Sequence, residues 1–268
     1  MFELEERDRL RQTYQVCRLG FGTLSLALVL ATLTLILLLA FEFTRLRLFH
    51  EILTAQWYRW IDTPIIWASL LGATLLWGRW DNPSWQRRIG LLLVMSLADI
   101  VLWAMTQGSE LEIFEREFGH EWLRYKLGQA LGWAELALIS TLACDYLVHL
   151  GVTSVKEMEK SIRSLITTGA AIWLFLFFAQ TNWKHGWPLQ GGRFVTREGF
   201  LLTLAVLLIQ TIVLMQVTAL TLLATRQSTR MLQDLDREDP YREFLRPGFD
   251  IDTEESKKAV AASLGYDW

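Results

Sequence analysis

The chain has 268 residues, of which 52% are hydrophobic and 12% aromatic, and its mean hydropathy is +0.24. The net charge of −3 is made of mixed signs, and no basic cluster is dense enough to indicate a nucleic-acid partner. Two cysteines are too few for a disulfide framework or a Cys-x-x-Cys metal site. The apolar residues come in long blocks. Such blocks indicate membrane spans, because a helix needs ~20 apolar residues to cross a hydrocarbon core of ~30 Å.

A charged amphipathic segment, 1–18, precedes the first charge-free run at 19–41. This run is longer than the apolar region of a signal peptide, about 7–15 residues, so we expect a retained first helix. Further segments with few or no charges lie at 60–78, 89–109, 127–151, 164–183 and 199–225. Backbone groups inside a bilayer must satisfy their own hydrogen bonds, which favours α-helices. The sequence therefore predicts an all-α integral membrane protein, a bundle of six transmembrane helices at 19–225.

Two segments between the predicted spans, 42–59 and 110–126, carry an apolar stripe at helical spacing beside charged residues. Each stripe steps by 3, 4, 4 and 3 residues, which places it on one helix face. The stripes consist of Leu46, Phe49, Leu53, Trp57 and Trp60, and of Leu111, Phe114, Phe118, Trp122 and Tyr125. We expect two amphipathic helices lying in the outer membrane interface. A docking face for a partner is the alternative.

Ionisable residues occur inside the predicted spans. Asp99 lies at the middle of 89–109, Asp62 lies at the edge of 60–78, and Glu135, Asp145 and His149 lie within 127–151. A charge facing lipid costs at least ~2.5–3.5 kcal/mol at mid-membrane, so these side chains should face the bundle interior. The last three fall within an arc of ~80° on one helix. Leucines also occupy that arc, so the sequence does not show a continuous polar pathway.

No Lys or Arg lies within the six predicted spans, so the sequence suggests no buried base of this chain to neutralise the acids. Three alternatives remain open. The acids are protonated and hydrogen-bonded across helices, they hold a proton or cation in transit, or they meet a basic residue of another subunit. For His149 we expect pairing with Asp145 at i, i+4.

The distribution of basic residues predicts orientation. If the N-terminus is inside, the inner segments hold 17 of the 26 Lys and Arg residues. Lys and Arg are enriched in cytoplasmic loops, so we expect both termini in the cytoplasm of a bacterial-type inner membrane.

The C-terminal segment 226–268 should form a cytoplasmic tail. Its first residues continue the last helix, and Pro240 interrupts it. Asp252 and Glu255 have the spacing of a capping box for a short terminal helix, which is followed by Tyr266 and Trp268. We interpret these four residues as a docking element for a partner, with a solvated tail as the alternative.

Catalytic motifs such as the P-loop, HExxH and GxSxG are absent from the sequence, so we expect no catalytic residue, metal or cofactor. The glycine pairs Gly20 with Gly22 and Gly128 with Gly132 lie at span ends, and Pro64 lies at a helix start. This favours unbroken helices over the interrupted helices of secondary transporters. Ala68 with Gly72, and Gly128 with Gly132, are small-residue pairs that permit close helix contacts.

The leading hypothesis is a non-enzymatic subunit or scaffold of a larger membrane assembly, with the lipid bilayer and other membrane protein subunits as partners. One alternative is a proton- or cation-coupled transporter or channel that uses the intramembrane acids. A third is a lipid-acting membrane enzyme, for which Asp145 and His149 come nearest to an interfacial polar cluster.

Overall fold

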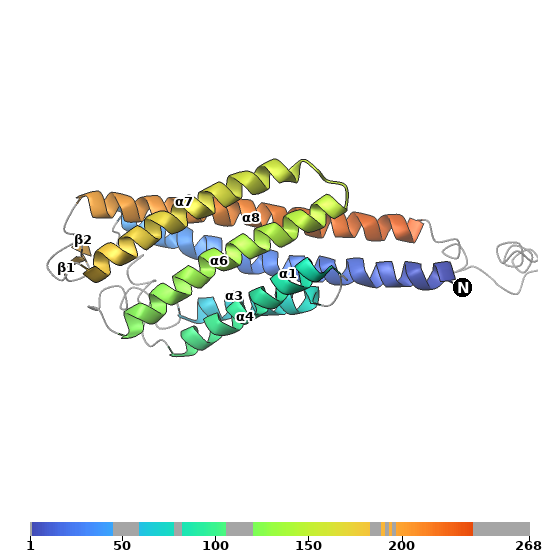
Figure 1. Ribbon diagram of the computed structural model, residues 1–268, viewed down its shortest axis with the longest axis horizontal. Helices are drawn as coiled ribbons and strands as arrows, with labels where there is room; N and C mark the ends of the chain where they lie inside the picture. Colours follow the sequence, from blue (N-terminus) through green and yellow to red (C-terminus); the bar gives the residue numbers. More distant parts are fainter. Residues whose placement is uncertain are drawn as a thin grey trace, which may run out of the picture. The chain divides into compact units, whose positions relative to one another are not determined.

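The computed structural model describes residues 2–44, 59–77, 82–105, 120–182, 189–190, 193–194 and 197–237, and these are almost entirely helical. The helices are α1 (Phe2–Thr44), α3 (Arg59–Leu76), α4 (Pro83–Met105), α6 (His120–His149), α7 (Val155–Asn182) and α8 (Arg197–Arg237) (Figure 1). The described residues also contain one short antiparallel pair, β1 (Leu189–Gln190) with β2 (Arg193–Phe194).

Five described helices are long and apolar enough to span a membrane, namely α1, α4, α6, α7 and α8. The helices confirm the predicted all-α architecture, and their length and composition are consistent with a membrane protein. The second predicted span corresponds to α3, whose described apolar stretch, Thr63–Leu76, is shorter. A sixth crossing therefore stays a prediction.

The chain divides into two compact units. The larger comprises Val16–Gln227, and the smaller comprises Met1–Gln15 together with Ser228–Trp268. In the smaller unit, Arg11 forms an ion pair with Asp236 at 2.9 Å, and the Arg7 guanidinium donates a hydrogen bond to the Leu235 carbonyl. The start of α1 and the end of α8 are thus joined through charged side chains and one backbone carbonyl.

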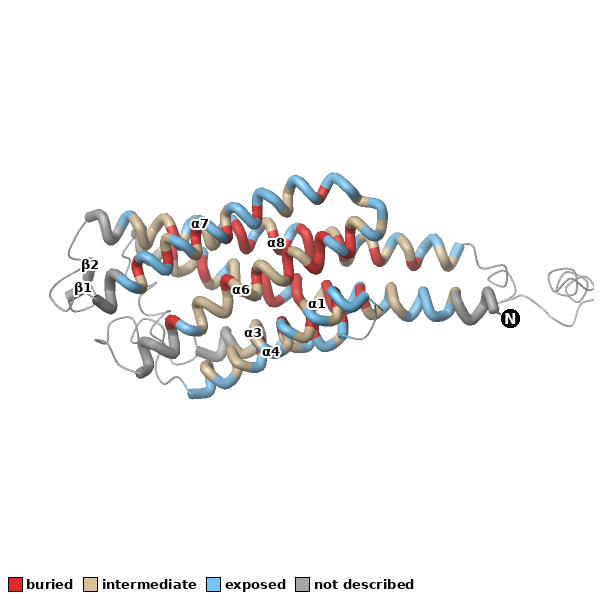
Figure 2. The backbone as a smooth tube through the Cα atoms, in the orientation of Figure 1, coloured by how far each residue is buried: buried red, intermediate tan, exposed pale blue. Residues whose placement is uncertain are grey.

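All six described helices contribute side chains to the core of the larger unit. Phe21 and Leu24 are fully buried, and the Phe21 ring contacts the Tyr146 ring of α6 with centroids 5.1 Å apart. Figure 2 shows that buried residues concentrate along the middle parts of the helices. Helix α4 packs on α3 and α6, and α6 packs on α7. The chain thus surrounds one apolar core with neighbouring helices.

Helices α1 and α3 approach so closely that their backbones touch at two glycines. A Cβ atom at Gly72 would lie 2.9 Å from the Gly20 carbonyl oxygen, and one at Gly20 would lie 3.2 Å from the Gly72 carbonyl oxygen. The close contact predicted for Gly72 is confirmed. At Gly132, by contrast, a Cβ would meet no atom within 4 Å, so the close contact predicted there is not found among the described residues.

Apolar side chains also cover the outside of the larger unit. The exposed face of α4 carries Leu91, Val94, Val101 and Met105, and the exposed residues of α8 include Leu208, Ile212, Met215 and Leu222. Soluble monomers rarely expose contiguous apolar surfaces of this extent. The exposed faces therefore agree with helices that contact lipid.

The helices extend beyond the predicted spans. Helix α1 begins at Phe2, inside the segment predicted as a separate amphipathic stretch, and α8 continues to Arg237. Helix α6 begins at His120 and so includes Trp122 and Tyr125, which were predicted to lie in a preceding interfacial helix. Backbone hydrogen bonding continues through these polar residues because no Pro or Gly interrupts 120–127.

Most of the predicted interfacial and docking residues lie outside the described part of the chain. Trp60 is within α3. The residues outside the described ranges are Leu46, Phe49, Leu53, Trp57, Leu111, Phe114, Phe118, Asp252, Glu255, Tyr266 and Trp268.

Candidate functional site

Three of the acids predicted to lie inside the membrane, Asp99, Glu135 and Asp145, lie where α4 and α6 pack against each other. Arg88 contacts Asp145, Ser96 contacts Glu135, and Asp99 lies near Gly128. Residue numbers rise along α4 as they fall along α6, so the two helices are antiparallel. We call this surface the α4–α6 polar face and define it by Ser96 and Asp99 of α4 and Gly128 and Glu135 of α6.

Glu135 contacts α4 through a single hydroxyl. The Ser96 Oγ donates a hydrogen bond to Glu135 Oε1 at 3.0 Å, and Ser96 is only 1% exposed. Half-buried Asp99 lies one turn further along α4, and its Oδ1 would be 3.5 Å from a Cβ at Gly128. The Asp99 and Glu135 carboxyl groups also interact electrostatically. Both acids therefore lie at one helix–helix contact.

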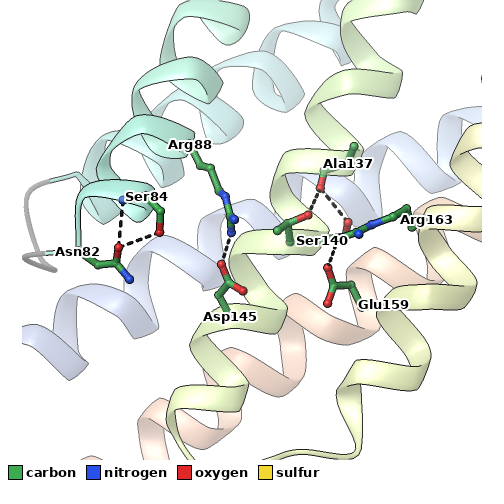
Figure 3. A network of polar contacts seen from close by, with 9 residues as sticks. Asn82, Ser84, Arg88, Ala137, Ser140, Asp145, Glu159 and Arg163 are labelled. Carbon is green, nitrogen blue, oxygen red and sulfur yellow. Dashed lines mark hydrogen bonds and ion pairs between the residues drawn. The ribbon is translucent and has the colours of Figure 1, made fainter.

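Asp145 is neutralised within the chain, which corrects the expectation that no basic residue could do so. Arg88 forms an ion pair with Asp145, and the two side chains are 37% and 48% exposed (Figure 3). Arg88 directly precedes the predicted span 89–109, and its long side chain reaches α6 from there. A partly exposed pair of this kind contributes little stability, typically ~0–1 kcal/mol.

Leucines separate the two polar contacts. Between the Arg88–Asp145 pair and the Ser96–Glu135 hydrogen bond lie Leu92 of α4 and Leu142 of α6, which are both fully buried. The groups that could carry a proton or cation along this surface are thus interrupted by packed side chains. This agrees with the sequence pattern, which showed leucines on the same arc.

A second polar contact joins α6 to α7, and the sequence analysis missed it. Lys126 is 7% exposed, and its Nζ donates to the Gln129 Oε1 at 3.2 Å. The same oxygen accepts a hydrogen bond from the Trp173 indole at 3.0 Å. The available signal was the i, i+3 spacing of Lys126 and Gln129, but a lysine at a span end is normally interpreted as a solvated boundary residue.

Hydroxyl groups in α8 are satisfied inside their own helix. Thr211, Thr218 and Thr225 repeat at heptad spacing, and each donates to the carbonyl four residues earlier at 2.7–2.9 Å. Such bonds satisfy a threonine in an apolar environment without a partner helix. The repeat is therefore explained by local backbone bonding.

The remaining candidate residues are not brought together with the α4–α6 polar face. Asp62 lies in α3, and its side chain is outside the described set. His149 ends α6 and is exposed, whereas Cys17 and Cys144 are buried thiols. Within the described ranges, no group of three or more His, Cys, Asp or Glu residues could hold a metal ion.

Comparisons with known proteins do not relate this chain to a family. No protein-family model matches the chain, and neither a curated protein nor a solved structure does.

Proposed function

We propose that this chain is a non-enzymatic subunit or scaffold of a larger membrane protein assembly. The observation that carries the proposal is the interruption of the α4–α6 contact by packed leucines. Glu135 bonds Ser96 and Asp145 pairs with Arg88, while Leu92 and Leu142 are fully buried between these contacts. Polar groups used in this way fix how helices pack. That role suits a packed structural bundle better than a conducting pathway.

The lengths of α1 and α8 support an extramembrane role for their polar ends. The 41 residues of α8 span ~62 Å at ~1.5 Å per residue. A hydrocarbon core of ~30 Å is crossed within ~39 Å even at a tilt of ~40°. Part of α8, and of the 43-residue α1, therefore extends beyond hydrocarbon. In our proposal these ends and residues 252–268 offer a partner a cytoplasmic binding surface.

Orientation and membrane type belong to the same proposal. We place both termini in the cytoplasm of a bacterial-type inner membrane, with six crossings that include α3. The support is the excess of Lys and Arg on one side, 17 of 26. Lys156 and Lys160 at the start of α7, and Arg87 and Arg88 at the start of α4, belong to that side.

The test is purification of the intact complex. The full-length chain, tagged at its N-terminus, is solubilised gently from native membranes and analysed by native mass spectrometry. We expect a stoichiometric partner that is lost when 252–268 is replaced by a Gly-Ser linker of equal length. As the matched control, Arg87→Gln changes an exposed charge at the start of α4, outside that surface, and should retain the partner. A lone monomer or homo-oligomer would overturn the proposal.

A proton- or cation-coupled transporter is the second candidate, and one observation favours it. Asp99 and Glu135 interact electrostatically from facing helices, with Ser96 beside them. If this candidate is right, Asp99→Asn abolishes ion flux into liposomes without disturbing assembly. Asp145→Asn, which changes the partly exposed pair with Arg88, leaves the ion flux intact. The lipid-acting enzyme has no comparable observation, since Arg88 engages Asp145.

A further inference from the structure

Helix α7 carries one exposed stripe along most of its length. We call it the α7 stripe and define it by Lys156, Lys160, Arg163, Thr167, Ala171, Leu174 and Phe178. Successive members are three or four residues apart, which places them on one face of an α-helix. Each of them is exposed, while Ile162, Ile166, Trp173 and Leu176 of the same helix are buried in the core. Figure 2 shows this alternation of exposed and buried positions along α7.

The chemistry of the α7 stripe changes along its length. Its N-terminal members are basic, and its C-terminal members Leu174 and Phe178 are large and apolar. The eleven helical steps from Thr167 to Phe178 rise ~16 Å, which is about half of a ~30 Å hydrocarbon core. The apolar end therefore matches the thickness of one leaflet, and this match would put the basic end at headgroup depth.

The basic end has positive charge to offer a ligand. Arg163 pairs with Glu159 at 2.6 Å (Figure 3). In the part of the chain that the structure describes, neither Lys156 nor Lys160 forms an ion pair. Two lysines one turn apart, next to an apolar surface one leaflet deep, complement a negative headgroup with an attached acyl chain. Basic residues at this depth attract anionic lipids.

We propose that the α7 stripe binds an anionic phospholipid of the bilayer. Its phosphate lies between Lys156 and Lys160, and an acyl chain follows the surface toward Leu174 and Phe178. This inference depends on the membrane location of α7 and not on the proposed role as a subunit.

The test measures lipid binding to the full-length protein in nanodiscs. Native mass spectrometry and titration with phosphatidylglycerol in a phosphatidylcholine background give the number and affinity of retained anionic lipids. Each lysine near the surface is expected to contribute about fivefold in affinity, so Lys156→Gln with Lys160→Gln should weaken binding about 25-fold. Lys156→Arg with Lys160→Arg keeps the charge and should bind as the unaltered chain does.

The matched control removes two exposed charges from the smaller unit, Arg9→Gln with Arg230→Gln, and should leave phosphatidylglycerol binding unchanged. Equal binding by the lysine-to-glutamine variant would overturn the proposal. An equal loss in the arginine control would also overturn it, because the attraction would then be unspecific. So would release of the lipid by inorganic phosphate alone, because the acyl surface would then contribute nothing.

Discussion

One hydroxyl connects the two helices that carry the intramembrane acids. Ser96 Oγ donates to Glu135 Oε1 at 3.0 Å, and Ser140, which is equally buried, donates instead to Ala137 of its own helix at 2.9 Å. Hydrogen bonds across membrane helices contribute ~0.6 kcal/mol on average and ~1.7 kcal/mol at most. Ser96 thus bonds across two helices, whereas Ser140 bonds within its own helix, and comparing the two isolates the effect of the contact between helices.

We expect Ser96→Ala to lower the free energy of unfolding by about 1 kcal/mol, because it also leaves a carboxyl oxygen without its donor. Ser140→Ala should cost clearly less. Unfolding in bilayer-like micelles measures both. Combined with Glu135→Leu, Ser96→Ala should be less harmful than the sum of the single changes, because both partners of one bond are then removed. Strict additivity would show that the hydroxyl and the carboxylate do not interact.

Two glycines on facing elements test packing at single-residue resolution. A Cβ at Gly169 of α7 would lie 2.5 Å from Cη2 of Trp133, whereas one at Gly132 of α6 would meet nothing within 4 Å. Gly169→Ala should therefore destabilise the protein by ~1–3 kcal/mol through overpacking. Gly132→Ala should be neutral or stabilising by roughly 0.5–1 kcal/mol, since alanine favours helix. Thermal unfolding of both variants in one detergent measures the two changes in stability. Equal changes would contradict the packing of Trp133 against Gly169.

The residues of the α4–α6 contact were only partly predictable. Sequence spacing placed Glu135 and Asp145 on one arc of a helix, and both contact α4. Spans were defined as stretches between basic residues, so Arg88 was placed outside the span 89–109 and was not considered as a partner for Asp145. Its long side chain nevertheless reaches beyond its own backbone position. Ser96 was missed because a serine inside an apolar run normally bonds its own backbone. Which hydroxyl bonds across depends on tertiary packing.

Helix positions were predictable, but helix ends were not. The runs with few or no charges mark the apolar part of each helix, and α4, α6, α7 and α8 each contain most of one run. A helix can continue beyond its apolar residues, because the backbone hydrogen bonds of an α-helix form in water-exposed turns as well as in apolar ones. Helix α7 therefore starts at Val155, nine residues before the predicted 164.

The α1–α3 contact is a close approach of two backbones, and α1 carries its own control. Gly20→Ala would place a Cβ 2.8 Å from Leu76 and 3.2 Å from the Gly72 carbonyl, whereas Gly22→Ala would meet only Thr225 at 3.8 Å. Since a backbone cannot rotate away, we expect Gly20→Ala to separate the helices and cost ~1–3 kcal/mol. Gly22→Ala should cost less than ~0.5 kcal/mol.

Cross-linking between cysteines introduced into α1 and α3 measures that separation directly. A lower yield in the Gly20→Ala background, with an unchanged yield for Gly22→Ala, is the expected result. If both backgrounds cross-link equally well, the two helices do not rely on backbone contact.

At the scale of the whole molecule, α3 decides the topology. Its 18 residues rise ~27 Å, close to the ~30 Å of a hydrocarbon core. If α3 crosses, six crossings return the chain to its starting side. If it does not, the five remaining helices place the two ends on opposite sides. The parity of the crossings therefore follows from this one element.

Cysteine labelling tests this parity, because Cys17 and Cys144 are both buried and can be replaced by alanine to give a cysteine-free background. Single cysteines replace Glu6, Ser84 in the first turn of α4, and Ser256. A membrane-impermeant maleimide should react with all three only after the membrane is opened. Among the described helices, only α1 and α3 are candidate crossings between Glu6 and Ser84. Reaction of these two positions from opposite sides would therefore show that α3 does not cross, and it would overturn the six-span arrangement with both termini in the cytoplasm.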